Sequence, residues 1–388
     1  MKRSKCTGIK DAGWILKIIS AVLILTLTLK FAIPISSFIL KIYEPAGKSS
    51  SLSAVSRNEE NTTAQSLGSI KEIEAEAESE AVTESDISDI SDSPAVNTPS
   101  EYITPQDIKD YEQEYLSAFS SLSPKGKVSE VFFRTSGSTD KAGDIYIKNA
   151  TATKKPDFEG LLSEGPELYI KDASEPVVLI FHTHTTESYL LSDNGVFYED
   201  FDTRSTDSSK NMLRIGYEIC KVLKENNIGY IHDENTYDES YEGAYARSRV
   251  TVEEYLRKYP SIKIVLDVHR DAIYYSDTSH CKPTAEINGK KAAQIMIITG
   301  AEEGYITDFP NWEKNLRFAL CFQQTAEEKY PGLMKPIYFC QRKYNMDTSP
   351  CSVLIEVGTD ANTLDEAMYS GYLTGNILSD IIKEYSEG

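Results

Sequence analysis

Residues 176–189, PVVLIFHTHTTESY, join an apolar run to a cluster of polar side chains. The run from Val177 to Phe181 is continuous and rich in β-branched residues, which predicts a strand buried on both faces of a sheet. His182, His184 and Glu187 follow it directly. Because alternate residues of an extended chain point to one side, we expect the two imidazoles to face one cavity. Imidazole and carboxylate groups this close together suit a zinc ion, so the stretch predicts a metal or catalytic site rather than a hydrogen-bonded loop histidine.

From about Thr104 onward, apolar strands alternate with amphipathic helices. Apolar residues recur at helical spacing after residue 211, and Asp207 or Ser208 can cap that helix. Thr363 and Glu366 form a T-x-x-E capping box that predicts the start of the last helix. This alternation predicts an α/β domain with a mainly parallel sheet and helices on both faces. The predicted strands are residues 128–134, 144–149, 177–181, 228–231, 262–268, 294–299 and 352–357, and the predicted helices are residues 106–121, 212–223, 244–258, 312–329 and the segment from 363.

Polar residues stand at the ends of three of these strands. The histidine pair and Glu187 end the first strand, His269 follows the strand 262–268, and Glu356 lies near the end of the strand 352–357. Ligands of open α/β sheets bind beyond the carboxyl ends of the strands, so we expect these groups to meet at one rim. Asp267 is expected to be a hydrogen-bond partner of the site rather than a metal ligand.

The roles follow from what zinc hydrolysis needs, namely three protein ligands, an open position for water and a carboxylate that takes the water's proton. Glu356 ends a buried strand, where partial desolvation favours a raised pKa, so we predict that it is the base. The competing interpretation is a carboxylate paired with Arg270 or Lys343. His232 and His280 lie in polar turns and are expected at the surface.

Composition excludes some partners. The chain has 40 Lys and Arg against 60 Asp and Glu, a net charge of −20. This argues against a nucleic-acid binder that neutralises phosphates, and against unaided binding to an anionic lipid surface. The 6 cysteines form no C-x-x-C pair, which is typical of neither a zinc ribbon nor a dense disulfide framework.

The N-terminus predicts a membrane anchor. Residues 1–13 are basic, and from Trp14 to Leu40 the only charges are Lys17 and Lys30. About 20 apolar residues cross a bilayer, so residues 14–40 are predicted to span it once. The basic flank keeps residues 1–13 in the cytoplasm and places the rest outside the cell membrane. A cleaved signal peptide with its apolar region at residues 18–29 is the competing interpretation.

Residues 41–103 are predicted to be a disordered tether. Residues 48–101 hold twelve Asp or Glu against Lys48, Arg57 and Lys71, with no aromatic residue among them. Such a segment buries too little apolar surface to offset its chain entropy. Residues 104–388 are then the extracytoplasmic catalytic domain.

Three separated motifs carry a family resemblance. FHTHTTESY, the run DVHRDA from Asp267 to Ala272, and VLIEVGTDANTLDEA from Val353 to Ala367 resemble the stage II sporulation protein P family. That family consists of membrane-anchored peptidoglycan hydrolases of endospore-forming bacteria, and its catalytic part is similar to zinc-dependent N-acetylmuramoyl-L-alanine amidases. The resemblance implies hydrolysis of the amide between muramic acid and L-alanine during engulfment, with cleavage of peptide cross-links as a further activity. It also implies partners in the engulfment machinery, namely a lytic transglycosylase and a membrane scaffold.

The resemblance also assigns residues. The second amidase histidine falls on His269 and the late glutamate on Glu356, whereas the first histidine is either His182 or His184. In amidases a zinc-binding glutamate usually opens a helix, but the matching start at residues 207–211 lacks one, so Glu187 is the candidate in its place.

Other assignments stay open. Arg270 binds a peptide carboxylate or the developing oxyanion, or it forms a structural ion pair. Two other functions remain to be separated from the amidase: a membrane-tethered scaffold in which the histidines are structural, and a zinc peptidase of the carboxypeptidase type.

Overall fold

The computed structural model describes residues 103–387. The predicted cytoplasmic segment, the anchor and the tether up to residue 102 lie outside the described residues. Among residues 103–387, no helix is both long and apolar enough to cross a membrane.

Each helix and strand predicted from the sequence has a counterpart in the structure, with bounds shifted by a few residues. The helices are α3 (Pro105–Phe119), α4 (Phe158–Glu164), α5 (Met212–Glu225), α6 (Ala244–Lys258), α7 (Trp312–Lys329) and α8 (Leu364–Glu384), with a 3₁₀ turn η3 (Met346–Thr348). The strands are β1 (Gly126–Val131), β2 (Asp140–Ala142), β3 (Ile145–Asn149), β4 (Pro176–Phe181), β5 (Val196–Phe197), β6 (Gly229–His232), β7 (Ile264–Asp271), β8 (Tyr274–Ser276), β9 (Ser279–Ile287), β10 (Lys290–Ala293), β11 (Ile295–Gly300), β12 (Ile337–Cys340) and β13 (Cys351–Thr359).

The central sheet is mixed, so the prediction of a mainly parallel sheet is wrong in this respect. Its eight strands follow the order β2-β3-β12-β11-β13-β7-β4-β6. The group β13, β7, β4, β6 is parallel, and so is the group β3, β12, β11, but the two groups meet antiparallel between β11 and β13. A helix connects β4 to β6 and β11 to β12, whereas β12 returns to β13 without a crossover helix. Parallel neighbours need such a crossover and antiparallel neighbours do not.

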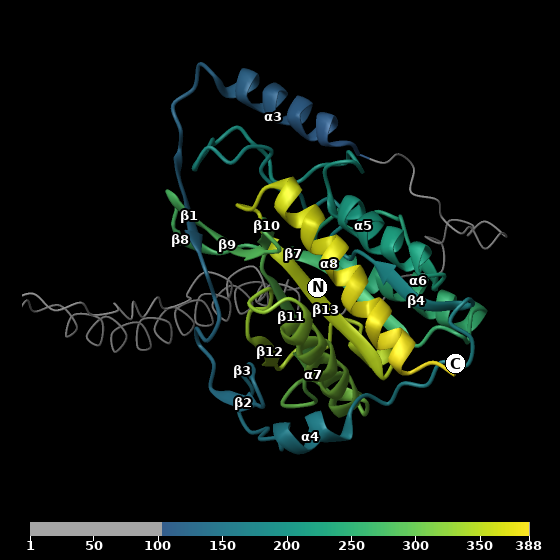
Figure 1. The fold of residues 1–388 in the computed structure, drawn as a ribbon. Helices are drawn as coiled ribbons and strands as arrows, with labels where there is room; N and C mark the ends of the chain where they lie inside the picture. Colours follow the sequence, from purple (N-terminus) through teal and green to yellow (C-terminus); the bar gives the residue numbers. More distant parts are fainter. Residues whose placement is uncertain (1–102, 388) are drawn as a thin grey trace, which may run out of the picture. The chain divides into compact units, whose positions relative to one another are not determined.

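Helices cover both faces of this sheet, as predicted. Val178 and Ile180 of β4 belong to the core that contains α5, α7 and α8, whereas Leu179 and Phe181 pack with Val252 of α6. Figure 1 shows α8, in yellow, lying over β13 between α5 and α7. The continuous apolar run therefore fills two cores, one on each face.

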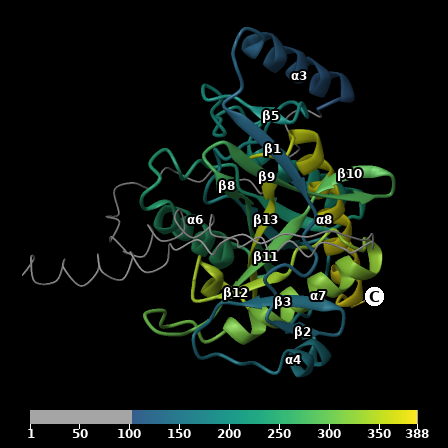
Figure 2. The ribbon, with the colours of Figure 1, turned by 90° about the vertical axis from the view of Figure 1, so that its left-hand side faces the viewer.

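A second sheet was not predicted. It contains β10-β9-β1-β5, with β8 paired to β9 (Figure 2). Asn288 and Gly289 form the two-residue turn between β9 and β10, and both have positive φ, 51° and 76°. An Asn-Gly pair between strands is the common signal for this hairpin, because both positions need the left-handed region. The signal is present in the sequence and was missed.

The helix starts show which local predictions hold. Thr363 and Glu366 form both bonds of the predicted capping box at α8. The predicted cap of α5, Asp207 or Ser208, is wrong. Asn211 caps the helix instead, because its side-chain oxygen accepts from the Leu213 N–H at 3.0 Å. Asp207 instead accepts from the backbone and hydroxyl of Ser209 in the preceding turn.

Strand register brings the predicted rim together. Glu356 on β13 lies directly opposite His269 on β7, and Asp267 on β7 lies opposite Phe181, the last residue of β4. These three parallel strands therefore end at one edge of the sheet.

Candidate active site

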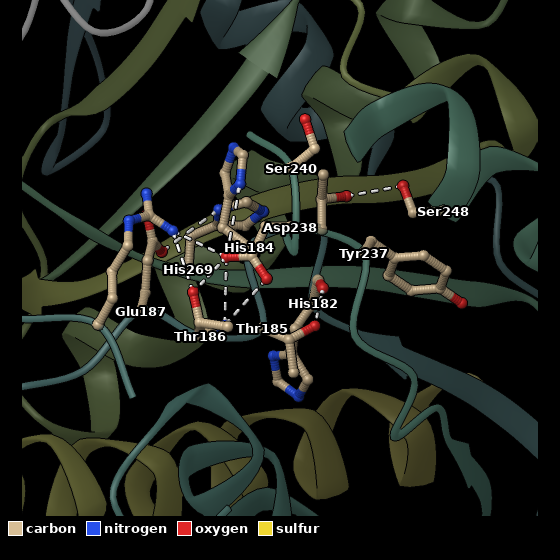
Figure 3. A network of polar contacts seen from close by, with 12 residues as sticks. His182, His184, Thr185, Thr186, Glu187, Tyr237, Asp238, Ser240, Ser248 and His269 are labelled. Atoms are coloured by element: carbon tan, nitrogen blue, oxygen red, sulfur yellow. Dashed lines mark hydrogen bonds and ion pairs between the residues drawn. The ribbon is translucent and has the colours of Figure 1, made fainter. Parts of the chain in front are cut away.

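Three side chains from two distant segments lie together, two of them in the turn that follows β4 and one near the end of β7. Nδ1 of His269 is 3.6 Å from Oε2 of Glu187. The His184 ring meets the His269 ring edge-on, with centroids 5.3 Å apart. All three side chains are buried, and Figure 3 shows them grouped. We call His184, Glu187 and His269 the donor cluster.

Asp267 orients His269 within this cluster. Its Oδ1 lies 2.7 Å from Nε2 of His269. The same carboxylate accepts from the backbone N–H of Thr183 at 2.9 Å and from its hydroxyl at 2.7 Å. Nε2 of His269 is thus in ion-pair contact with a carboxylate, and Nδ1 lies toward Glu187. Asp267 takes the role of hydrogen-bond partner that the sequence predicted.

His182 points away from the donor cluster, so the expectation that His182 and His184 face one cavity is wrong. Its Nδ1 lies 2.8 Å from the Val268 carbonyl oxygen, and its Nε2 lies 2.9 Å from Nε2 of His232. A Cβ at Gly216 of α5 would lie 2.7 Å from His182 Nε2. β4 ends at Phe181, and the chain turns at once, so the alternation of an extended strand does not continue to His184.

Of the two histidines that were expected at the surface, His232 is buried and His280 is half-buried. His232 ends β6 and is 1% exposed. His280 lies on β9 between the rings of Phe197 and Tyr274, and its Nδ1 is 3.6 Å from Asp360 Oδ2. Both were placed in turns because the strands that carry them were predicted too short or not at all.

Arg270 holds Glu187 rather than facing open space. Its backbone N–H donates to Glu187 Oε2 at 3.2 Å, and its guanidinium lies 3.9 Å from Oε1. The guanidinium also donates to the carbonyl oxygens of Ser188 and Thr203. These contacts fit the structural ion pair, one of the open interpretations of Arg270, and they fix the carboxylate that faces His269.

A loop covers His184 from the other side. The Tyr241 ring stacks on the His184 ring, with centroids 4.7 Å apart and planes 3° from parallel. Asp238 Oδ2 lies 4.0 Å from His184 Nδ1 and accepts from Arg204 at 2.7 Å. Asp238 also accepts from the hydroxyl of Thr186 at 2.6 Å. Sequence reasoning missed Asp238 and Arg204, because neither belongs to a motif and only the tertiary fold brings them to the histidine.

Glu356 lies beside the donor cluster on the same face as His269. Its Oε2 is buried and has no hydrogen-bond partner among residues 103–387. Neither Arg270 nor Lys343 pairs with it, since Arg270 contacts Glu187 and Lys343 pairs with Asp347. A buried carboxylate oxygen without a partner is costly and calls for a functional explanation.

Burial and neighbouring charge shift the pKa of each group. Burial lowers the pKa of His184 to about 4 and, with the carboxylate of Asp271, raises that of Glu356 to about 8. Burial would raise the pKa of Glu187, but Arg270 and His269 outweigh it and hold the pKa below its usual range. Burial would likewise lower the pKa of His269, yet Asp267 and Glu187 raise it well above normal. Burial and neighbouring charges therefore shift the pKa values of the two glutamates at this rim in opposite directions.

A family comparison bears on this site. The family model described as Stage II sporulation protein P (SpoIIP) matches residues 47–383, which include the donor cluster and Glu356. The chain belongs to the Stage II sporulation protein P family. A curated relative, Stage II sporulation protein P of Bacillus subtilis (strain 168), is 27% identical over 217 residues, covering 53% of this chain and 51% of the relative. The chain thus spans about half the length of the curated relative it matches.

Solved structures show weaker likeness. The amidase Ami1 from Mycobacterium abscessus is 13% identical with a TM-score of 0.29, covering 54% of this chain and 98% of that chain. AmiC2 of Nostoc punctiforme is 13% identical with a TM-score of 0.33, covering 54% and 96%. The CwlD amidase from Clostridioides difficile, solved with the GerS lipoprotein, is 12% identical with a TM-score of 0.32, covering 54% and 98%. At these scores the likeness settles neither the fold nor the chemistry of this Stage II sporulation protein P family member.

The donor types in this family member fit zinc, although the geometry is not that of a closed site. Within residues 103–387, no three His, Cys, Asp or Glu side chains meet the spacing of an assembled metal centre. The cluster nevertheless offers two imidazoles and a carboxylate, the donor set of many catalytic zinc sites. Asp267 behind His269 supplies the supporting carboxylate that zinc-binding histidines usually have. Glu356 Oε2, which is buried and has no hydrogen-bond partner among the described residues, lies on the strand next to that of His269.

Proposed function

We propose that this chain is a zinc-dependent cell-wall hydrolase that cleaves the amide between N-acetylmuramic acid and L-alanine in peptidoglycan during endospore engulfment. The observation that carries the proposal is the register of β13 on β7, which sets Glu356 opposite His269 at the edge of the donor cluster. Membership in the Stage II sporulation protein P family supports the cell-wall substrate. Peptide cross-links are the second bond proposed for the same site.

His184, Glu187 and His269 would hold the metal. Of the two histidines left open by the sequence, His184 is the better ligand because its ring borders His269, whereas His182 bonds to His232 and a backbone carbonyl. When bound, zinc supplies a water of lowered pKa and polarises the scissile carbonyl. Three protein donors leave a fourth position for that water.

Glu356 acts as the proton carrier. Its carboxylate accepts a proton from the attacking water and returns it to the departing amine, so one group serves as base and then acid. Its buried, unpartnered Oε2 leaves an acceptor position free for this work. The raised pKa keeps the proton affinity of the group close to neutral pH, where such transfer is efficient.

Arg270 and Asp267 position the cluster. Arg270 holds Glu187 through its backbone N–H and its guanidinium, so it orients a donor instead of contacting the substrate. Asp267 keeps the proton of His269 on Nε2 and leaves Nδ1 as the donor nitrogen. Both act through another residue and are positioning residues.

The cellular setting completes the proposal. Residues 14–40 anchor the chain in the cell membrane, residues 1–13 remain in the cytoplasm, and residues 41–103 tether an extracytoplasmic catalytic domain at residues 104–388. Partners in the engulfment machinery, a lytic transglycosylase and a membrane scaffold, are proposed from the family alone. Nucleic acid is not proposed as a partner, given the net charge of −20.

Digestion of purified peptidoglycan by the full chain tests the activity. Release of intact stem peptides with a new L-alanine amino terminus identifies an amidase, and separated cross-links identify an endopeptidase. Release of single C-terminal residues would instead identify a carboxypeptidase-type enzyme. A protein that purifies without stoichiometric zinc and releases no fragment would be the tethered scaffold.

A further inference from the structure

Arg342 lies two residues beyond β12, and its hydrogen bonds go to neutral oxygens. Its Nη1 donates to the Tyr305 hydroxyl at 2.7 Å and to a backbone carbonyl oxygen at 3.0 Å, and its Nε donates to the Tyr344 hydroxyl at 3.2 Å. In the part of the chain that the structure describes, no carboxylate forms an ion pair with this guanidinium. Arg249, by contrast, binds both carboxylate oxygens of Asp347. The charge of Arg342 is therefore not compensated by a described residue.

The groups around Arg342 offer protons rather than lone pairs. Each tyrosine hydroxyl accepts a bond from the guanidinium, so its own O–H is left to be donated. Neither O–H, nor Nη2 of Arg342, donates to a residue that the structure describes, and none of these atoms is sealed from solvent. A half-buried cation beside two hydroxyl donors suits an anion, because bonds to an ionised acceptor are the stronger ones.

The turn after β12 fixes Tyr344 beside Arg342. Tyr344 has a φ of 42° and Asn345 a φ of 56°, in the left-handed region that a bulky side chain rarely adopts. Asn345 donates to the Tyr245 carbonyl oxygen at 3.0 Å and to the Ser248 hydroxyl at 3.1 Å, which ties the turn to α6. Backbone outliers of this kind persist where their surroundings impose them, and they cluster at functional sites.

Stacked rings connect this turn to the donor cluster. The Tyr344 ring lies on the Tyr245 ring with centroids 4.9 Å apart, and the Tyr245 ring lies 6.3 Å from that of His269 with planes 9° from parallel. Burial raises the pKa of the Tyr344 hydroxyl, and the charges of Arg342 and Glu356 both act on it, which agrees with a place between them. An extended peptide advances about 3.3–3.6 Å per residue, so about five residues reach from the cluster to the guanidinium.

We propose that Arg342, with the hydroxyls of Tyr305 and Tyr344, binds a carboxylate of the peptide part of the substrate, within about five residues of the scissile amide. The inference rests on the proposed function, which places that amide at the donor cluster. The chain contains 60 Asp and Glu, yet none of the described ones pairs with Arg342, which leaves the guanidinium to a ligand. A planar guanidinium in a half-buried position recognises a carboxylate well.

Binding by the full chain in detergent gives a readout that is independent of turnover. The probes are a synthetic stem peptide with free carboxylates and the same peptide with every carboxylate replaced by a carboxamide. The wild-type protein should bind the acid about tenfold more tightly, and Arg342→Met should bind both forms alike. Tyr305→Phe, which removes one hydroxyl from an exposed side chain, should reduce the preference by about threefold.

Arg317→Met is the matched control and should keep the wild-type preference. Arg317 is also half-buried and also donates to a backbone carbonyl oxygen, but it lies on α7, which covers the other face of the central sheet. If Arg342→Met does not fold, the preference of Tyr305→Phe decides the question, since that change leaves the ring in place.

Hydrolysis of the corresponding N-acetylmuramoyl peptides gives the second readout. In Arg342→Met, kcat/KM should fall by about tenfold for the acid and stay unchanged for the carboxamide. Equal loss on both substrates, an unchanged preference in Arg342→Met, or loss of preference in Arg317→Met would overturn the assignment. Failure of the proposed function gives a different result: the wild-type protein would cleave neither substrate, while the binding preference would persist and would still depend on Arg342.

Discussion

Nε2 of His182 lies 2.9 Å from Nε2 of His232, with both rings buried between β4, β6 and α5. Only one of the two nitrogens carries a proton when both imidazoles are neutral, and a second proton would place two like charges in contact. This contact joins the end of β4 to the end of β6 outside the donor cluster.

Stability should therefore fall in acid through this pair. Burial lowers the pKa of His182 from 6.5 to about 4, and it lowers that of His232 as well. The unfolded chain then binds more protons than the folded one below about pH 6.5, so the stabilisation is complete above that pH and is lost as the pH falls toward 4. Each proton taken up changes the free energy of unfolding by ~1.4 kcal/mol per pH unit. Urea unfolding at several pH values should show a shallower acid dependence in His232→Gln than in the wild type.

Exchanging the histidines one at a time separates ligand from structure. His184→Ala should lower bound zinc and activity together, since two donors hold zinc poorly. His182→Ala should keep its zinc but lose about 1–3 kcal/mol of stability, because it removes the partner of His232 Nε2. Metal analysis and thermal unfolding of both variants provide the check. Loss of zinc in His182→Ala with full metal in His184→Ala would reverse the assignment.

Glu356 and His269 should respond differently although they lie opposite each other. His269→Ala removes a donor, so metal and activity should both fall. Glu356→Gln keeps the shape but removes the proton acceptor, so zinc should stay bound while hydrolysis falls by ~10²–10⁴-fold. If Glu356→Gln also loses its metal, the residue is a ligand and the base must be sought at Glu187.

Asp267→Asn tests the support behind His269. The amide cannot hold the His269 proton as the carboxylate does at 2.7 Å, so zinc affinity should fall by ~10–100-fold. Competition with a chromogenic chelator measures this change. Asp172→Asn is the control, because Asp172 also accepts a backbone N–H and a hydroxyl, from Ser174, but lies at the exposed surface. Equal affinity in both variants would show that Asp267 does not tune the metal.

The tether prediction is separate from the chemistry. Residues 48–101 should set the reach of the domain and add nothing to catalysis, since their composition predicts no packed structure. A chain that begins near Tyr102 should hydrolyse isolated peptidoglycan about as fast as the full ectodomain. A large loss of rate would mean that the acidic segment binds substrate or folds.

The sequence predicted those helices and strands in which apolar residues recur at regular spacing or form a continuous run. α6 and α7 have the predicted bounds, and β4 and β13 were found because continuous β-branched runs leave few alternatives. β13 runs antiparallel to β11 because of the path the chain takes after β12. The spacing of apolar residues within a strand carries no information on that path. β12 itself was missed because IYFC is too short to stand out from a loop.

The sequence predicted the part of the candidate site whose residues lie near the ends of parallel strands. His269 and Glu356 met because their strands are parallel neighbours, a consequence of fold class. His182 was misplaced because the chain turns directly after Phe181, and a period of two residues holds only while the strand continues. Asp238 and Arg204 approach the rim from segments with no motif, so only the folded chain shows them.

The register between β7 and β13 also makes the proposed site depend on the C-terminal part of the chain. The donor cluster is complete at residue 269, but Glu356, the proposed proton carrier, lies on a strand that ends at Thr359 and packs against α8. A chain trimmed ahead of Glu356 would carry the donors without the proton carrier. Under the proposed function, we expect such a chain to be inert toward peptidoglycan.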